Sequence, residues 1–256
     1  MMIENENNGK EEERTDFPKT SPEPAPATRR RHRGGVPIFR NALFCLTPLL
    51  LYLLISSGLS SLTAFYFPDS LPGRDLASMT ALCDAVILPV MIILYRRDAE
   101  KGVRPMAVRP KESGKRLLLY ALIFLAGMAL SVFSSFLMEL FHMERFFSNA
   151  AQETLLSAPP AVQVIALGIL APAAEEMVFR GLFYSRTRFY LNRYTAALVS
   201  ALFFAAGHGN VIQMLYAFPM GLILVLVYEK TGSIAGPVVC HMGANMISVL
   251  INLLAA

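Results

Sequence analysis

Seven long runs of apolar residues constrain this chain more than any other feature of its sequence. They lie at about 41–58, 76–95, 117–140, 159–182, 195–211, 212–229 and 233–255. An α-helix needs about 20 apolar residues to cross the hydrocarbon core of a bilayer. Charged residues make up only 16% of the chain, well below the roughly 25% of soluble domains. The sequence therefore predicts an all-α, polytopic bundle of about seven transmembrane helices and excludes an ordinary soluble domain.

The first 36 residues differ in composition from the rest. They are polar, rich in proline and almost free of aliphatic side chains. A segment of this kind buries too little apolar surface to fold. We expect a disordered cytoplasmic tail over 1–36, followed by a transmembrane domain over 37–256. The tail ends in a basic anchor formed by Arg29, Arg30, Arg31 and Arg33.

Lysine and arginine are distributed unevenly between the two sides of the predicted bundle. One side holds the basic anchor, the basic loop 96–116, the segment 186–193 and Lys230, whereas the other side holds Arg74 and Arg145. Basic residues concentrate in cytoplasmic loops. The pattern predicts a multi-pass protein of the plasma membrane with a cytoplasmic N-terminus. It also accounts for the net charge of +4 without a nucleic-acid partner, and none is expected.

Ionisable residues within the apolar runs point to a functional site, because charged groups are costly inside a membrane. Glu176 and Arg180 are four residues apart, which suits an ion pair on one helical face. Glu175 points about 100° away from Glu176 and is left as the free carboxylate. Pro172 removes a backbone hydrogen bond beside this pair, which membrane helices tolerate only where protein or water satisfies the freed group.

Two further short segments place polar side chains four residues apart in later spans. Phe204 and His208 occur in FAAGH at 204–208, and His241 and Asn245 occur in HMGAN at 241–245. Such residues either hold helices together or face a common polar site. At 1.5 Å per residue, Glu175 and His241 lie about 10–12 Å from the predicted cytoplasmic edge, and His208 lies nearer 20 Å. Either the fifth span begins after residue 195, or the fourth continues through residue 186.

The three segments together resemble the CPBP family of intramembrane proteases, which includes the CAAX prenyl endopeptidases and relatives linked to bacteriocin immunity. The family pattern is EExxxR, then FxxxH, then HxxxN in successive membrane helices. This chain has EEMVFR at 175–180, FAAGH at 204–208 and HMGAN at 241–245. The resemblance covers about 159–250. It implies an endopeptidase that hydrolyses peptide bonds of membrane-associated or prenylated-type peptides.

The resemblance also implies roles for individual residues. Glu175 and His208 would hold and deprotonate the attacking water, while His241 and Asn245 would stabilise the oxyanion. Glu176, Arg180 and Phe204 would support the site. If a metal takes part, the zinc ligands would be Glu175, His208 and His241. The chain has no HExxH motif, and relatives are described as using a glutamate without a metal, so we expect no cofactor.

Other functions stay open at the level of sequence. A proton-coupled transporter also uses intramembrane carboxylates, histidines and broken helices, although it usually carries them in both halves of the chain. A non-catalytic immunity or scaffold protein that keeps the site would have the same motifs. Asp84 either lines a substrate cavity or hydrogen-bonds a neighbouring span, and we expect the second. The substrate and the oligomeric state do not follow from the sequence.

Overall fold

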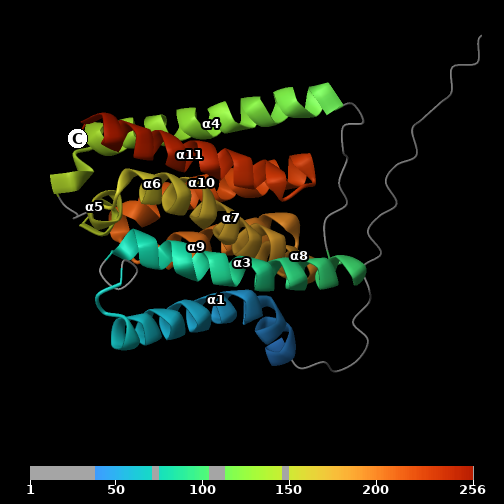
Figure 1. Cartoon of the computed structure of the whole chain (residues 1–256). Coiled ribbons are helices and arrows are strands. Elements are labelled where there is room, and N and C mark those ends of the chain that lie inside the picture. The colour runs from blue at the N-terminus through green and yellow to red at the C-terminus, as the bar shows by residue number, and fades with distance from the viewer. Residues whose placement is uncertain (1–37, 71–74, 104–112, 146–149, 256) are drawn as a thin grey trace, which may run out of the picture. The chain divides into compact units, whose positions relative to one another are not determined.

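The computed structural model describes residues 38–70, 75–103, 113–145 and 150–255 (Figure 1). Within these residues the chain forms helices and no strands, which confirms the predicted all-α membrane bundle. The tail over 1–36, Arg74 and residues 104–112 of the basic loop lie outside the described residues. The prediction for the tail therefore stays a prediction.

Six helices are long and apolar enough to cross a membrane. Five of them are single elements, and the sixth, spanning Pro160–Tyr190, is assembled from five consecutive helical segments. The single elements are α1 (Ile38–Tyr66), α3 (Leu76–Glu100), α4 (Ser113–Leu140), α10 (Val211–Thr231) and α11 (Ala235–Ala255). The composite helix contains α6 (Pro160–Val162), η2 (Gln163–Leu170), α7 (Ala171–Glu176), η3 (Met177–Tyr184) and α8 (Ser185–Tyr190).

The predicted fifth span is a shorter apolar helix, α9 (Arg193–Gly207), with 15 residues. Its start is set by Asn192, whose side chain accepts hydrogen bonds from the backbone N–H groups of Tyr194 and Thr195. Its end is set by Gly209, which adopts a left-handed φ of 64°. Two short elements, η1 (Met143–Arg145) and α5 (Ala150–Leu156), precede the composite helix.

The fourth span is longer than predicted, because the composite helix continues to Tyr190 and does not end at residue 182. Glu175 and His208 are therefore separated from the Leu191–Asn192 turn by the same number of residues. Each lies about 24 Å from this turn along its own helix. Of the two explanations for the mismatch in depth, the structure confirms the continuation of the fourth span.

The helices pack in layers around the composite helix (Figure 1). α11 lies along α4 on one side, α1 and α3 lie together on the other, and α9 pairs with α10. The crossing of α4 and α11 depends on two glycines. A Cβ on Gly127 would lie 1.9 Å from the carbonyl oxygen of Cys240, and one on Gly243 would lie 2.1 Å from that of Phe124. Small residues of this kind let membrane helices approach closely.

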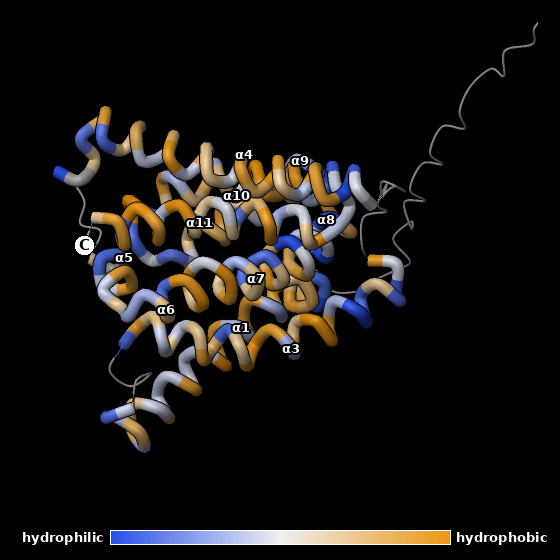
Figure 2. Tube along the Cα trace, turned by 45° about the horizontal axis from the view of Figure 1, so that its top comes forward, coloured by the Kyte–Doolittle hydropathy of each residue, from blue (hydrophilic) through white to orange (hydrophobic). Residues whose placement is uncertain are grey.

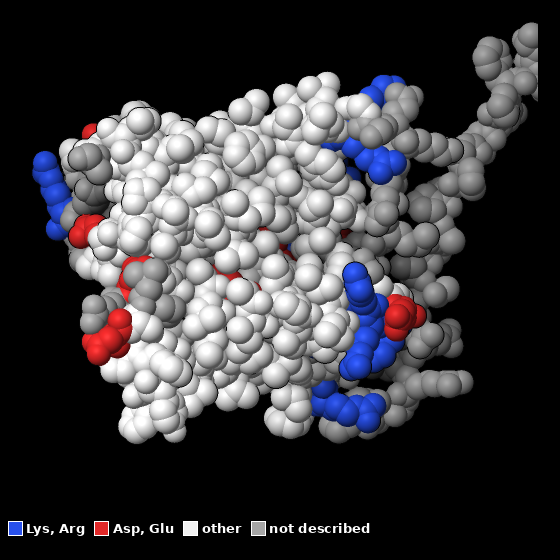
Figure 3. All heavy atoms as spheres, viewed as in Figure 1, with Lys and Arg blue, Asp and Glu red and all other residues white. Residues whose placement is uncertain are grey.

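The outer surface of the bundle is apolar along the length of the helices, and hydrophilic residues gather at its ends (Figure 2). Figure 3 shows Lys and Arg side chains at the end where α8 and the C-terminal end of α3 lie. Between the two ends, a few acidic atoms are visible among the apolar side chains of this face (Figure 3). The described residues thus present an apolar belt with acidic groups inside it.

Candidate functional site

The composite helix departs from regular α-helical geometry on both sides of Glu175 and Glu176. These carboxylates lie in α7, and the flanking segments η2 and η3 are π-helical. π-helical turns are rare and occur frequently at functional sites. Two backbone carbonyls of η3 accept hydrogen bonds from serine side chains. Ser200 of α9 donates to the carbonyl of Phe179, and Ser185 donates to that of Arg180.

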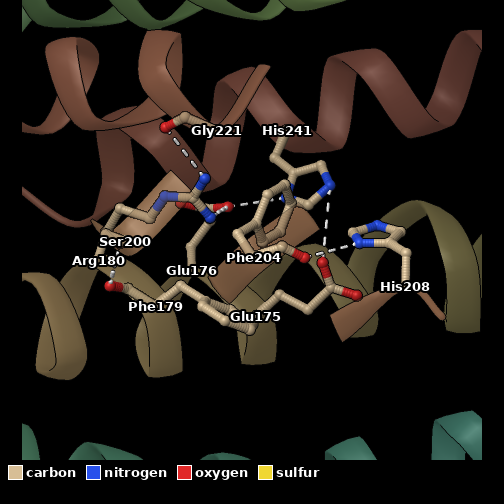
Figure 4. A network of polar contacts seen from close by, with 9 residues as sticks. All are labelled: Glu175, Glu176, Phe179, Arg180, Ser200, Phe204, His208, Gly221 and His241. Atoms are coloured by element: carbon tan, nitrogen blue, oxygen red, sulfur yellow. Dashed lines mark hydrogen bonds and ion pairs between the residues drawn. The ribbon is translucent and has the colours of Figure 1, made fainter. Parts of the chain in front are cut away.

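Glu176 is the buried centre of the polar network (Figure 4). One of its carboxylate oxygens, Oε1, accepts hydrogen bonds from Arg180 Nη1 at 2.8 Å and from His241 Nδ1 at 2.9 Å. Arg180 is fully buried as well, and its Nη2 donates to the carbonyl of Gly221 at 3.3 Å. The ion pair that the spacing predicts is therefore present, and it also fixes a histidine from another helix.

Glu175 lies on the accessible side of this network, and its side chain is 23% exposed. Its Oε2 is 3.9 Å from His241 Nε2, too far for a direct hydrogen bond. The same oxygen is buried and has no hydrogen-bond partner among the described residues. Figure 4 shows the Glu175 carboxylate beside the rings of both His208 and His241. The structure thus brings together the free carboxylate and the two histidines that the motifs predict.

Each histidine is oriented by a hydrogen bond from its Nδ1 atom. His208 Nδ1 donates to the carbonyl oxygen of Phe204 at 2.9 Å, and His241 Nδ1 donates to Glu176. The bond at one ring nitrogen decides the proton state of the other. Neutral His208 therefore keeps a lone pair on Nε2. His241 presents a lone pair on Nε2 when it is neutral and an N–H group when it is protonated.

Phe204 holds the three basic side chains in place. Its ring meets the rings of His208 and His241 edge-on, with centroids 5.0 and 5.7 Å apart. The Arg180 guanidinium lies over the same ring, with its central carbon 4.1 Å from the ring centroid. The packing that the motif implies for Phe204 thus extends to both histidines.

Asn245 lies one turn beyond His241 on α11, but its amide faces the backbone of η2. Its Nδ2 donates to the carbonyl oxygen of Leu167 at 2.9 Å. One of the two amide N–H groups is therefore occupied within the protein. The sequence motif does not indicate this contact, because Leu167 lies on a different helix.

Asp84 of α3 is the carboxylate that the sequence analysis left without a clear partner. It is 1% exposed, and neither of its oxygens lies at ordinary hydrogen-bond distance from a donor among the described residues. The carboxylate nevertheless interacts with the side-chain hydroxyl of Tyr52 on α1, so the expected contact with a neighbouring span is present. Tyr52 of α1 and Glu175 lie within electrostatic range of it. Tyr52 was missed by the motifs because they cover only the second half of the chain.

Among the residues that the structure describes, no three His, Cys, Asp or Glu side chains are arranged to hold a metal ion. The Nδ1 atoms of His208 and His241 are engaged in hydrogen bonds, so Nε2 is the ring atom that either histidine would offer to a metal. The proposed zinc ligands Glu175, His208 and His241 do not form a ligand set in this arrangement, and we derive no step through a metal.

Comparison with known proteins agrees with the motifs. Residues 157–247 match the family Type II CAAX prenyl endopeptidase Rce1-like. The membrane-embedded CAAX protease MroQ of Staphylococcus aureus (strain USA300) is 27% identical over 172 residues, which cover 65% of each chain. The putative membrane peptidase YdiL of Bacillus subtilis (strain 168) is 28% identical over 96 residues, 36% of this chain and 38% of that protein. An uncharacterized 24.3 kDa protein of Escherichia coli is 28% identical over 142 residues, 54% of this chain and 61% of that protein.

The matches cover less than two thirds of the length of each of these relatives. No solved structure matches the chain. The matched segment 157–247 contains all three motifs, and the resemblance to the CPBP family of membrane proteases is confirmed.

Proposed function

We propose, on the premise that residues 157–247 form an Rce1-like protease domain, that this chain is an intramembrane endopeptidase. It hydrolyses peptide bonds of membrane-associated or prenylated-type peptides. The nucleophile is a water molecule that Glu175 and His208 activate. No metal takes part in this mechanism.

One observation carries the proposal: a free carboxylate oxygen lies beside two histidines whose other ring nitrogens are already engaged. Glu175 Oε2 is itself buried and lies 3.9 Å from His241 Nε2, so a water or substrate oxygen contacts both atoms once it enters between the carboxylate and the histidines. A general base must lie within hydrogen-bond reach of the proton that it removes, and Glu175 meets this condition for such a water. The ion pair of Glu176 with Arg180 leaves Glu175 free for this task.

The chemistry follows from these positions. Glu175 takes a proton from the water while the water oxygen attacks the carbonyl carbon of the scissile bond. His208 Nε2 accepts a hydrogen bond from the second water proton. Protonated His241 donates from Nε2 to the oxyanion of the tetrahedral intermediate, an interaction worth about 3–4 kcal/mol in comparable sites. Glu175 then passes its proton to the leaving amine nitrogen as the C–N bond breaks.

The distribution of charge supports a cytoplasmic N-terminus in the plasma membrane. Basic side chains gather at the end of the bundle formed by α8 and the C-terminal end of α3 (Figure 3). Residues at this end include Arg96 and Arg97 of α3 and Arg188 of α8. Because cytoplasmic segments carry an excess of Lys and Arg, this end faces the cytoplasm.

The test compares the wild type with Glu175→Gln, each reconstituted in liposomes and incubated with a diverse peptide pool that includes isoprenylated C-terminal sequences. Mass spectrometry then identifies the products. Glu139→Gln is the matched control, because Glu139 is an exposed carboxylate near the end of α4. We expect cleavage by the wild type and Glu139→Gln and none by Glu175→Gln. Equal cleavage by all three would contradict the role of Glu175, and no cleavage by the wild type would contradict the proposed activity.

A further inference from the structure

We infer that Asn245 is a positioning residue whose side-chain amide replaces the backbone N–H group that Pro172 lacks. The inference deepens the proposed function and rests on it only where activity is measured. One N–H of the amide that the motif links to the oxyanion binds the backbone of the composite helix.

The hydrogen bonds around Leu167 carry the inference. In α-helical geometry its carbonyl would accept from the N–H of Ala171, and in π-helical geometry it would accept from the N–H of residue 172. Ala171 donates to the carbonyl of Ala166 instead, which is the π-helical bond. Residue 172 is a buried proline and has no N–H. Both backbone donors are thus lost to the Leu167 carbonyl, and Asn245 Nδ2 binds it at 2.9 Å.

The contact ties the proline break to the site. Asn245 and His241 lie one turn apart on α11, and each binds the composite helix on a different side of Pro172. Asn245 binds Leu167 before the break, and His241 binds Glu176 after it. Together the two bonds set the position of α11 along the composite helix, and with it the 3.9 Å separation of His241 Nε2 from Glu175.

A carbonyl without a donor inside a membrane is costly, so loss of the amide shifts the register that the two bonds maintain. Asn245→Ala is therefore expected to lower the thermal unfolding midpoint by several degrees and kcat by about tenfold or more. The substitution is expected to lower kcat more than it changes KM, because it displaces His241, whose Nε2 faces the oxyanion in the proposed mechanism.

The decisive experiment restores the donor in the backbone. Pro172→Ala gives residue 172 an N–H, and the Leu167 carbonyl then has a backbone partner in either helical geometry. In the double variant Asn245→Ala/Pro172→Ala we expect both the unfolding midpoint and kcat to return close to the values of Pro172→Ala alone. Pro172→Ser supplies the same N–H if the alanine variant does not fold.

Asn252→Ala is the matched control. Asn252 lies on the same helix, and its Nδ2 donates to the carbonyl of Leu156 at 3.0 Å, away from the proline. Adding Pro172→Ala to Asn252→Ala is expected to leave the lowered unfolding midpoint of Asn252→Ala unchanged. If kcat stays low in Asn245→Ala/Pro172→Ala while the midpoint recovers, Asn245 contacts the reacting atoms and the inference is wrong. If the midpoint shows no rescue, the inference is also wrong. The unfolding midpoint tests the hydrogen bond even where no cleavage is observed. Failure of the proposed function can therefore be told apart from failure of this inference.

Discussion

Two buried aspartates on α3 are predicted to respond to the same substitution in opposite ways. Asp98 forms an ion pair with Arg186, with 2.6 Å between Oδ2 and Nε, and both side chains are almost fully buried. Asp84 lies about four turns earlier on the same helix and forms no ion pair among the described residues; the polar groups beside it are Tyr52 and Glu175. Substitution by asparagine keeps the shape of either side chain and removes its ability to carry a negative charge.

The change in stability for each variant depends on the groups that lose their contact with the aspartate. Arg186 also donates to the carbonyl of Phe44 at 2.8 Å, and its guanidinium lies 4.3 Å from the Phe44 ring centroid. These contacts hold the guanidinium inside the protein, so Asp98→Asn leaves a buried charge without compensation. Breaking a buried pair in this way costs about 3–5 kcal/mol. Asp84→Asn removes a buried carboxylate that has no cationic partner among the described residues, and we expect it to stabilise the protein by about 0–2 kcal/mol.

The assay is thermal unfolding of the purified variants in one detergent, followed by the loss of helical circular dichroism. For a body of this size, 1 kcal/mol shifts the midpoint by about 2–4 °C. Asp98→Asn should therefore lower the midpoint by about 6–20 °C, while Asp84→Asn should leave it unchanged or raise it. Equal losses in the two variants would refute the reasoning, because they would mean that burial alone, and not the partner, determines the cost.

Two further predictions concern the site. Glu176→Gln removes the negative charge that Arg180 and His241 share, so we expect the cleavage rate to fall about a hundredfold or more and the unfolding midpoint to drop. Glu175→Gln, by contrast, should lose activity with little change in the unfolding midpoint. Intact stability of Glu176→Gln would contradict its place at the centre of the network. A strong chelator such as 1,10-phenanthroline is expected to leave cleavage unchanged; inhibition that added zinc reverses would establish a metal-dependent reaction.

The sequence alone determined the features that depend on local spacing and composition. Runs of about 20 apolar residues are enough to predict membrane helices, because the bilayer leaves few other ways to satisfy the backbone. The pairing of Glu176 with Arg180 was also predictable, since residues four apart on a helix always lie on one face. The resemblance in three motifs then indicated that Glu175, His208 and His241 belong together.

Tertiary structure decided the features that depend on how one helix sits against another. The bond from His241 to Glu176 and that from Asn245 to Leu167 each join α11 to the composite helix, and helical periodicity carries no information on that register. The approach of Asp84 to Glu175 likewise depends on the packing of α3. Side chains of other helices also bind backbone carbonyls of the π-helical segments, with Asn245 binding one in η2 and Ser200 one in η3. These contacts join residues that are far apart in the sequence, so they become visible only in the folded bundle.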